Sequence, residues 1–134
     1  MGNFTMTTTL AEPYDKAVER VREQLGEVGF GVLTEIDIKA TMKNKLDVHV
    51  APKIILGACQ PNLAHQALEI DSRVAALMPC NVVVSDAGDD TSRVEALDPD
   101  VMPEFTGTAE LKDMASEARE RLSNMLDALG GTRA

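Results

Sequence analysis

The chain has 134 residues, of which 44% are hydrophobic and 26% charged, as expected for a folded globular protein with one core. Its formal net charge is -9 and it contains no basic run. This composition argues against nucleic-acid partners and against anionic membrane surfaces, because an acidic surface repels phosphate groups. No apolar stretch approaches the ~20 residues that cross a bilayer.

The start of the chain, MGNFTMTTTLAEPYDK, has neither the charged region nor the long apolar region of a signal peptide. Gly2 resembles a myristoylation start only weakly, and we discount it. The chain has two cysteines and no secretion signal, so we expect reduced thiols and a cytoplasmic location.

The N-terminal half predicts strands and helices in alternation. A Thr-rich, alternating stretch over 3–10 predicts a first strand. Apolar residues then recur at helical spacing over 13–28, between a proline and a glycine, and predict a helix. Residues 30–38 alternate as a second strand, and the polar segment 39–46 predicts a short helix.

The C-terminal half predicts three further strands and two further helices. The run 53–59 is continuously apolar, which is typical of a central strand buried on both faces, and a helix follows from Pro61. Residues 81–86 and 92–97 predict a hairpin across the turn DAGDD. The remaining segments are, in order, a loop over 98–108 and a long helix over 109–129.

The order βαβαβαββα indicates one α+β domain over 1–134, with a mixed sheet of about five strands and helices packed against it. A helix connects the strands 53–59 and 81–86, which favours a parallel arrangement of that pair. A parallel pair would place Cys59 and Cys80 at opposite edges of the sheet, whereas an antiparallel pair would bring them together. The sequence does not decide between the two.

Three blocks in order, GFGVLTEIDIKATMKNKLDV, ILGACQPNLAHQAL and LMPCNVVV, resemble the family called domain of unknown function 302. The resemblance is close over about residues 29–85. It implies a small α+β domain, usually cytoplasmic and often a dimer, and it implies no activity. The family commonly has Asn where this chain has Gln60, and Gln is the poorer helix N-cap, so the resemblance assigns Gln60 no fixed capping role.

Cys59 is the main candidate for chemistry. It lies just before the helix that starts at Pro61, where free N–H groups lower the pKa of a thiol and favour the thiolate. The alternative is that Cys59 is a small apolar residue packed at a tight turn. We expect both cysteines to be reduced and largely buried, with Cys59 more reactive than Cys80. Gln60 and His65 complete a candidate ligand-binding set, although His65 falls on the polar side of its helix.

A second candidate segment carries Lys39 and Lys43, either of which could bind an anion if it faces a cleft. The alternative is a solvated helix face. We expect no metal site and no cofactor. The two cysteines and two histidines have the ligand types of a zinc site, but they lack the closely spaced pairs that structural zinc uses.

These features support three hypotheses, of which the first is preferred. The first is binding or sensing of a small molecule near the turn 59–61, with the segment 39–45 close by. The second is a thiol-dependent redox enzyme using Cys59, for which no general base is evident. The third is a structural dimerisation domain. The apolar stripe of the 109–129 helix adds to the expectation of a homodimer, because a small sheet would leave part of it uncovered.

Overall fold

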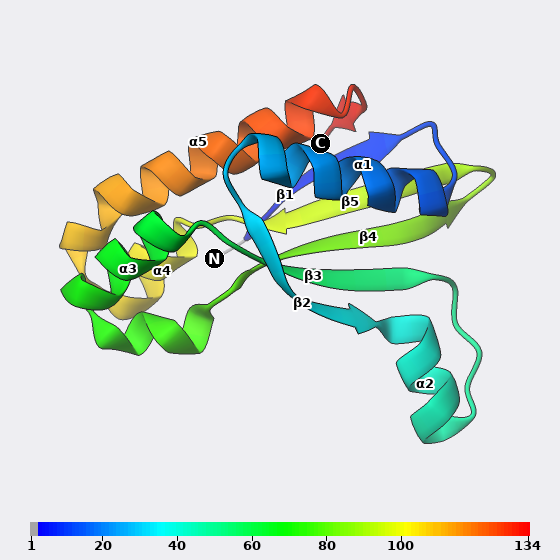
Figure 1. Cartoon of the computed structure of the whole chain (residues 1–134), viewed down its shortest axis with the longest axis horizontal. Coiled ribbons are helices and arrows are strands. Elements are labelled where there is room, and N and C mark those ends of the chain that lie inside the picture. The colour runs from blue at the N-terminus through cyan, green and yellow to red at the C-terminus, as the bar shows by residue number, and fades with distance from the viewer. Residues whose placement is uncertain (1–2) are drawn as a thin grey trace.

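The computed structural model describes residues 3–134, so the part of the N-terminal predictions that concerns Met1 and Gly2 lies outside the described residues. Within this range, six strands form one sheet in the order β2-β3-β4-β5-β1-β6, with helices packed against it (Figure 1). The predicted α+β class is therefore confirmed. The strands are β1 Thr5–Leu10, β2 Gly31–Asp37, β3 Lys53–Cys59, β4 Cys80–Gly88, β5 Thr91–Leu97 and β6 Thr132–Arg133. The helices are α1 Tyr14–Glu27, α2 Ile38–Leu46, α3 Pro61–Ile70, α4 Val101–Thr106 and α5 Lys112–Ala128, with 3-10 helices η1 Ser72–Leu77 and η2 Ala109–Leu111.

Every pair of neighbouring strands is antiparallel, including β3 and β4. The parallel arrangement that the connecting helix favoured is therefore wrong. The connection formed by α3 and η1 stays beyond the end of the sheet and does not cross back over it, so β4 begins where β3 ends (Figure 1). Ala58 is paired with Cys80 in this register, which brings Cys59 and Cys80 to the same end of the sheet.

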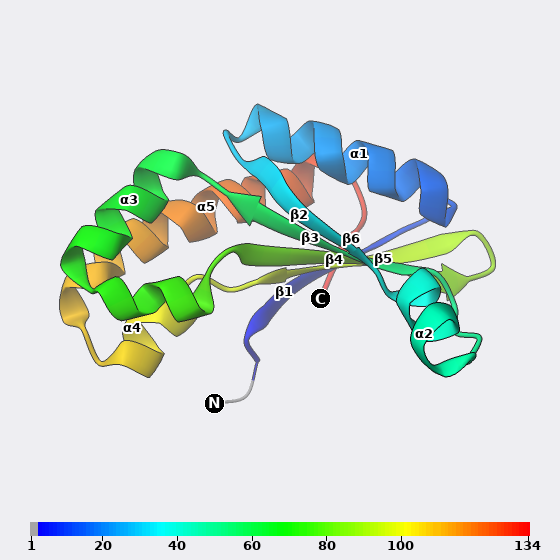
Figure 2. The same cartoon turned by 60° about the horizontal axis from the view of Figure 1, so that its bottom comes forward.

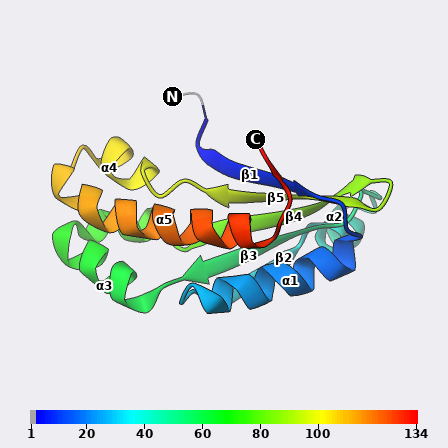
Figure 3. The same cartoon turned by 90° about the horizontal axis from the view of Figure 1, so that it is seen from above.

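The two faces of the sheet differ. On β3 and β4, Leu56 and Val82 point toward α1 and α5 and are fully buried, whereas Ile55 and Val83 point to the other side and are only partly buried. We call these sides the covered face and the open face. Figure 3 shows α1 and α5 lying over the covered face, and Figure 2 shows α2 projecting on the open side.

The apolar stripe of the C-terminal helix is covered within the chain. Its side chains pack with α1, α3 and β1, and none of them is more than 4% exposed. The expectation that the sheet leaves part of this stripe uncovered is therefore wrong, and the stripe gives no support to a homodimer. Its members are Leu111, Met114, Ala115, Ala118, Leu122, Met125, Leu126 and Leu129.

Local turn chemistry explains where the other predictions hold and where they miss. The β4–β5 hairpin is confirmed, and Asp89 and Asp90 at its tip both have positive φ, as a two-residue hairpin turn requires. The segment 98–108 was predicted as a loop but contains α4. Val101 and Met102 of α4 are buried in the core, and this tertiary packing stabilises a helix too short to be indicated by periodicity.

Candidate functional site

The turn between β3 and α3 is closed by a side-chain cap. Gln60 occupies the N-cap position of α3, and its Oε1 accepts a hydrogen bond from the backbone N–H of Leu63 at 2.8 Å. Pro61 follows at the first helical position, where its missing N–H costs nothing. Gln60 therefore does serve as a cap, contrary to the ranking of residue types, because its longer side chain folds back to reach the same N–H that Asn would reach.

A small cavity of about 30 Å³ lies behind this turn. This is enough space for about one water molecule. The polar and sulfur-bearing part of the cavity wall consists of Cys59, Gln60, Met78, Cys80, Met102 and Met114. The rest of the wall is apolar, and no acidic, basic or imidazole side chain among residues 3–134 lines the cavity.

The two cysteines in this wall are free thiols. Cys80 is buried, as expected, but Cys59 is only half-buried. Burial raises the pKa of the Cys59 thiol, and burial together with the nearby Cys59 raises the pKa of Cys80 to about 11. The expectation that the start of the helix lowers the pKa of Cys59 is therefore wrong. Loss of solvation in the apolar cavity is the cause of the raised pKa, and one of the free N–H groups at the start of α3 is already taken by Gln60.

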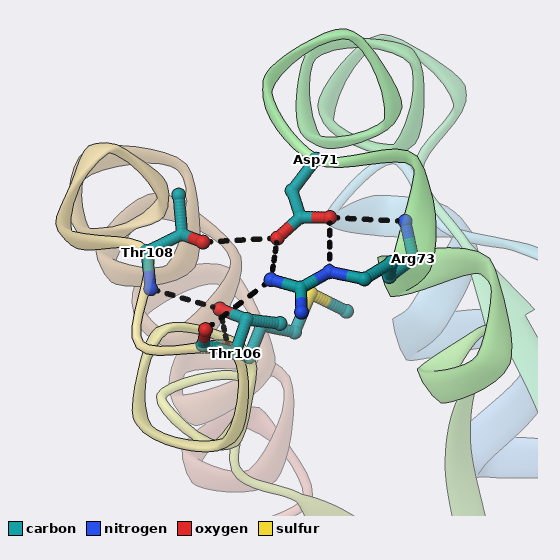
Figure 4. Close-up of polar contacts among 5 residues, drawn as sticks. Asp71, Arg73, Thr106 and Thr108 are labelled. Carbon is teal, nitrogen blue, oxygen red and sulfur yellow. Dashed lines mark hydrogen bonds and ion pairs between the residues drawn. The ribbon is translucent and has the colours of Figure 1, made fainter.

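A polar cluster that sequence reasoning missed holds together the two segments beside the cavity. The Asp71 carboxylate accepts hydrogen bonds from Arg73 Nε at 2.9 Å, from Arg73 Nη2 at 2.7 Å and from Thr108 Oγ1 at 2.9 Å (Figure 4). Arg73 Nη2 also donates to the Thr106 carbonyl at 3.3 Å. These bonds join the α3–η1 junction to the α4–η2 segment. We call this group of residues 71, 73, 106 and 108 the polar clasp.

The pKa of Asp71 lies well below its usual range. The hydrogen bonds from Arg73 lower this pKa most, and the hydrogen bond from Thr108 lowers it next. Thr106 Oγ1 donates to the carbonyl of Met102 at 2.7 Å, so the clasp is also linked to one wall of the cavity. The sequence contains one signal for this cluster, the spacing of Asp71 and Arg73 after an apolar helix. An Asp side chain commonly accepts a hydrogen bond from the backbone N–H two residues further along the chain.

The structure separates the remaining candidate residues from the cavity. His65 is exposed on α3, as expected, and its Nε2 lies 2.9 Å from the Glu69 carboxylate. Lys39 and Lys43 are exposed on α2, which lies at the other end of β3, and Lys43 pairs with Asp47 (Figure 1). The expectation of one pocket joining the turn 59–61 to the segment 39–45 is therefore wrong, because the whole of β3 lies between them.

Two further properties concern the described residues as a whole. Between Asn3 and Ala134, no three or more His, Cys, Asp or Glu side chains are grouped so that they could hold a metal ion. In the same range, none of the helices combines the length and the apolar composition needed to cross a membrane.

An antiparallel sheet with α1 and α5 over one face, and a sulfur-lined cavity at one end, define this chain as a small α+β domain. The family model described as "Domain of unknown function DUF302" matches residues 6–129, and the chain belongs to this family. The resemblance noted in the three sequence blocks is confirmed, and it extends into both flanks.

A similar solved structure is described as "Crystal structure of uncharacterized conserved protein DUF302 from Bacillus stearothermophilus". It is 27% identical to this chain, covers 92% of this chain and 96% of its own, and superposes with a TM-score of 0.84. No curated protein matches the chain.

Proposed function

We propose that this domain binds or senses a small, uncharged molecule in the cavity behind the Cys59–Pro61 turn. The supporting observation is the composition of the wall, in which two thiols and three thioethers meet without any charged group. Sulfur is polarizable and gains dispersion energy against an uncharged ligand. Methionine is also flexible, so Met78, Met102 and Met114 can change rotamer and widen the cavity around a ligand larger than water.

The thiol-redox alternative gains less support from this geometry. The raised pKa of each cysteine reduces its thiolate fraction at neutral pH, and thiolate is the reactive form. The cavity wall also supplies no side chain that could act as a general base for Cys59. The two thiols are better suited to lining a binding site than to attacking a substrate.

Xenon, a small and polarizable atom, is a suitable probe of the cavity. We expect xenon pressure to shift the amide resonances of residues 58–64 and 78–80 in ¹⁵N-labelled protein, in a saturable manner. Replacing Ala64, which lines the cavity, by Met should fill the space and abolish the shifts. Ala128→Met on the exposed side of α5 is the matched control. Absence of saturable shifts in the wild-type protein would contradict the proposal.

As a second candidate function, we propose self-association through the open face of the sheet. The supporting observation is the apolar surface that this face leaves uncovered: Phe4 is 53% and Ile36 46% exposed. Ile55, Val83 and Leu97 continue the surface along a hollow of about 450 Å³. A second copy presents the same apolar surface, so a two-fold pairing would bury each face against the other.

A further inference from the structure

The hydroxyl of Ser85 is an unexplained polar group. Ser85 is only 7% exposed, and its Oγ is buried without a hydrogen-bond partner in the described structure. A buried hydroxyl without a partner costs stability, and native proteins usually satisfy such groups with protein, water or a ligand. Residue alternation along β4 points this hydroxyl to the open face, the opposite side from Val84 of the core.

Two cations flank Ser85 in the same cross-strand row. Lys53 on β3 and Arg93 on β5 are its direct partners in the register. Within residues 3–134, every other arginine forms an ion pair, whereas Arg93 forms none. Lys53 forms none either, as is the case for every described lysine except Lys43. In the described part of the chain, this row therefore combines two cations that form no ion pair with a buried hydroxyl that forms no hydrogen bond, in a chain whose net charge is -9.

The row lies in a trough of about 420 Å³ between the sheet and α2. Ile38, Met42 and Val50 line the same trough and give it an apolar wall. Its volume is within the range of ordinary small-molecule sites, roughly 300–1,000 Å³. Lys39 and Lys43 are not among the lining residues, so the cations of this trough differ from those that the sequence indicated.

Two carboxylates lie near this row, and among the described residues neither forms an ion pair with its cations. Asp86 is one of the residues that line the trough, although its register partner Ser92 is a fully buried residue of the covered face. The Asp86 Oδ1 accepts a hydrogen bond from the Gly88 N–H at 2.9 Å. Glu95 lies on the open face one row away, and in the part of the chain described it forms no ion pair with Arg93. The cations are therefore free to bind an external anion.

We propose that this trough binds a small organic anion. Its oxyanion group, a carboxylate or a phosphate, lies between Lys53 and Arg93 and accepts a hydrogen bond from Ser85. Its apolar part lies against Ile38, Met42 and Val50. Arg93 suits this role because a guanidinium matches either oxyanion with two parallel hydrogen bonds. The site is on the opposite face of the sheet from the Cys59 cavity, so it does not depend on the ligand proposed for that cavity.

The test uses hexanoate and hexyl phosphate as probes, with hexanol as the uncharged analogue, in amide-shift titrations of the full chain. We expect one or both anions to shift residues 53, 85 and 93 saturably, and the stronger binder identifies the head group. Hexanol should bind at least about tenfold more weakly, because it cannot pair with the two cations. Failure of both anions to bind, or equal binding of hexanol, overturns the proposal.

Three variants localise the binding. Arg93→Gln and Lys53→Gln should each weaken it about tenfold or more, whereas Lys39→Gln, which removes the same charge outside the trough, should leave it unchanged. Ser85→Ala should weaken binding without lowering the urea midpoint, because it removes a buried hydroxyl that has no partner. Equal losses of affinity in Lys39→Gln and Lys53→Gln would show that the anion is attracted non-specifically to positive charge and would overturn the proposal. Unchanged affinity in Arg93→Gln would also refute the site.

Discussion

The covered and open faces of the sheet are built from the same strands but serve different purposes. On β3, Leu56 faces the helices and is 0% exposed, whereas its neighbour Ile55 faces a hollow on the open side. The covered face holds the core, and the Cys59 cavity is a small defect at one end of it. The open face carries Lys53 and Arg93, which form no ion pair among the described residues, and exposed apolar side chains such as that of Ile36.

This difference shows that neighbouring side chains on one strand can have separate roles, because they point to opposite faces of the sheet. A side chain packed between sheet and helices contributes to the free energy of unfolding, whereas its neighbour on the open side contributes little and is available to a ligand or a second copy. Variants at adjacent positions can therefore separate the two roles.

The largest expected effect comes from Leu56→Ala. Removing a fully buried leucine should lower the free energy of unfolding by about 2–5 kcal/mol, because it leaves a cavity among packed side chains. Ile55→Ala on the open face is the matched comparison, and should cost about 1 kcal/mol. Urea denaturation measures both. Similar losses at the two positions would mean that the open face is packed as tightly as the covered one.

The next effect concerns the polar clasp and pH. The pKa of Asp71 is lowered on folding, so its contribution to stability is present above the ordinary aspartate pKa of about 3.9 and is lost as pH falls below it. Asp71→Asn should therefore lower the melting temperature at neutral pH, and the gap to wild type should shrink in acid. Thermal melts between about pH 7 and pH 3 test this.

Asp90→Asn is the control for the clasp. Asp90 lies in the hairpin turn with positive φ, which Asn tolerates, and it forms no ion pair among the described residues. It should melt like wild type at every pH. A gap for Asp71→Asn that stays constant in acid would show that the ionised carboxylate is not what holds the clasp together.

A smaller effect separates the two thiols. Iodoacetamide should label Cys59 before Cys80 at neutral pH, because Cys59 is half-buried and the pKa of Cys80 is raised to about 11. The rate for Cys80 should rise as the pH approaches that value. Timed labelling followed by mass spectrometry gives the order. Faster labelling of Cys80, or a disulfide in protein isolated without oxidant, would contradict this placement.

Substitutions of exposed apolar residues on the open face should have the smallest effect on stability. Their effect is measured on self-association instead. Sedimentation equilibrium should show wild-type protein at twice the 14.4 kDa of one chain, and Phe4→Lys or Ile36→Lys should shift it to the single-chain mass. His65→Lys on the exposed side of α3 adds a positive charge elsewhere and should not change the mass. A single-chain mass for wild type at micromolar concentration would remove the second candidate function.

Local patterns in the sequence determined much of this protein. The order of the strands and α-helices up to residue 97, though not the 3-10 helix η1, followed from periodicity and turn residues. The β4–β5 hairpin, the strand-to-helix turn at Cys59–Pro61 and the family also followed, from turn residues and short sequence blocks. Such features depend on neighbours within a few residues, so the sequence displays them directly. The outward position of His65 on α3 also followed, because helical spacing assigns it to the polar side.

Only the tertiary structure decided which distant segments meet. The antiparallel pairing of β3 and β4 brought the two thiols together, and burial in their shared cavity then reversed the expected pKa shift of Cys59. The same pairing, with that of β4 and β5, aligned Lys53, Ser85 and Arg93 in one row. Strand register and the burial of a side chain arise from contacts between segments far apart in the chain, so a local sequence pattern does not predict them.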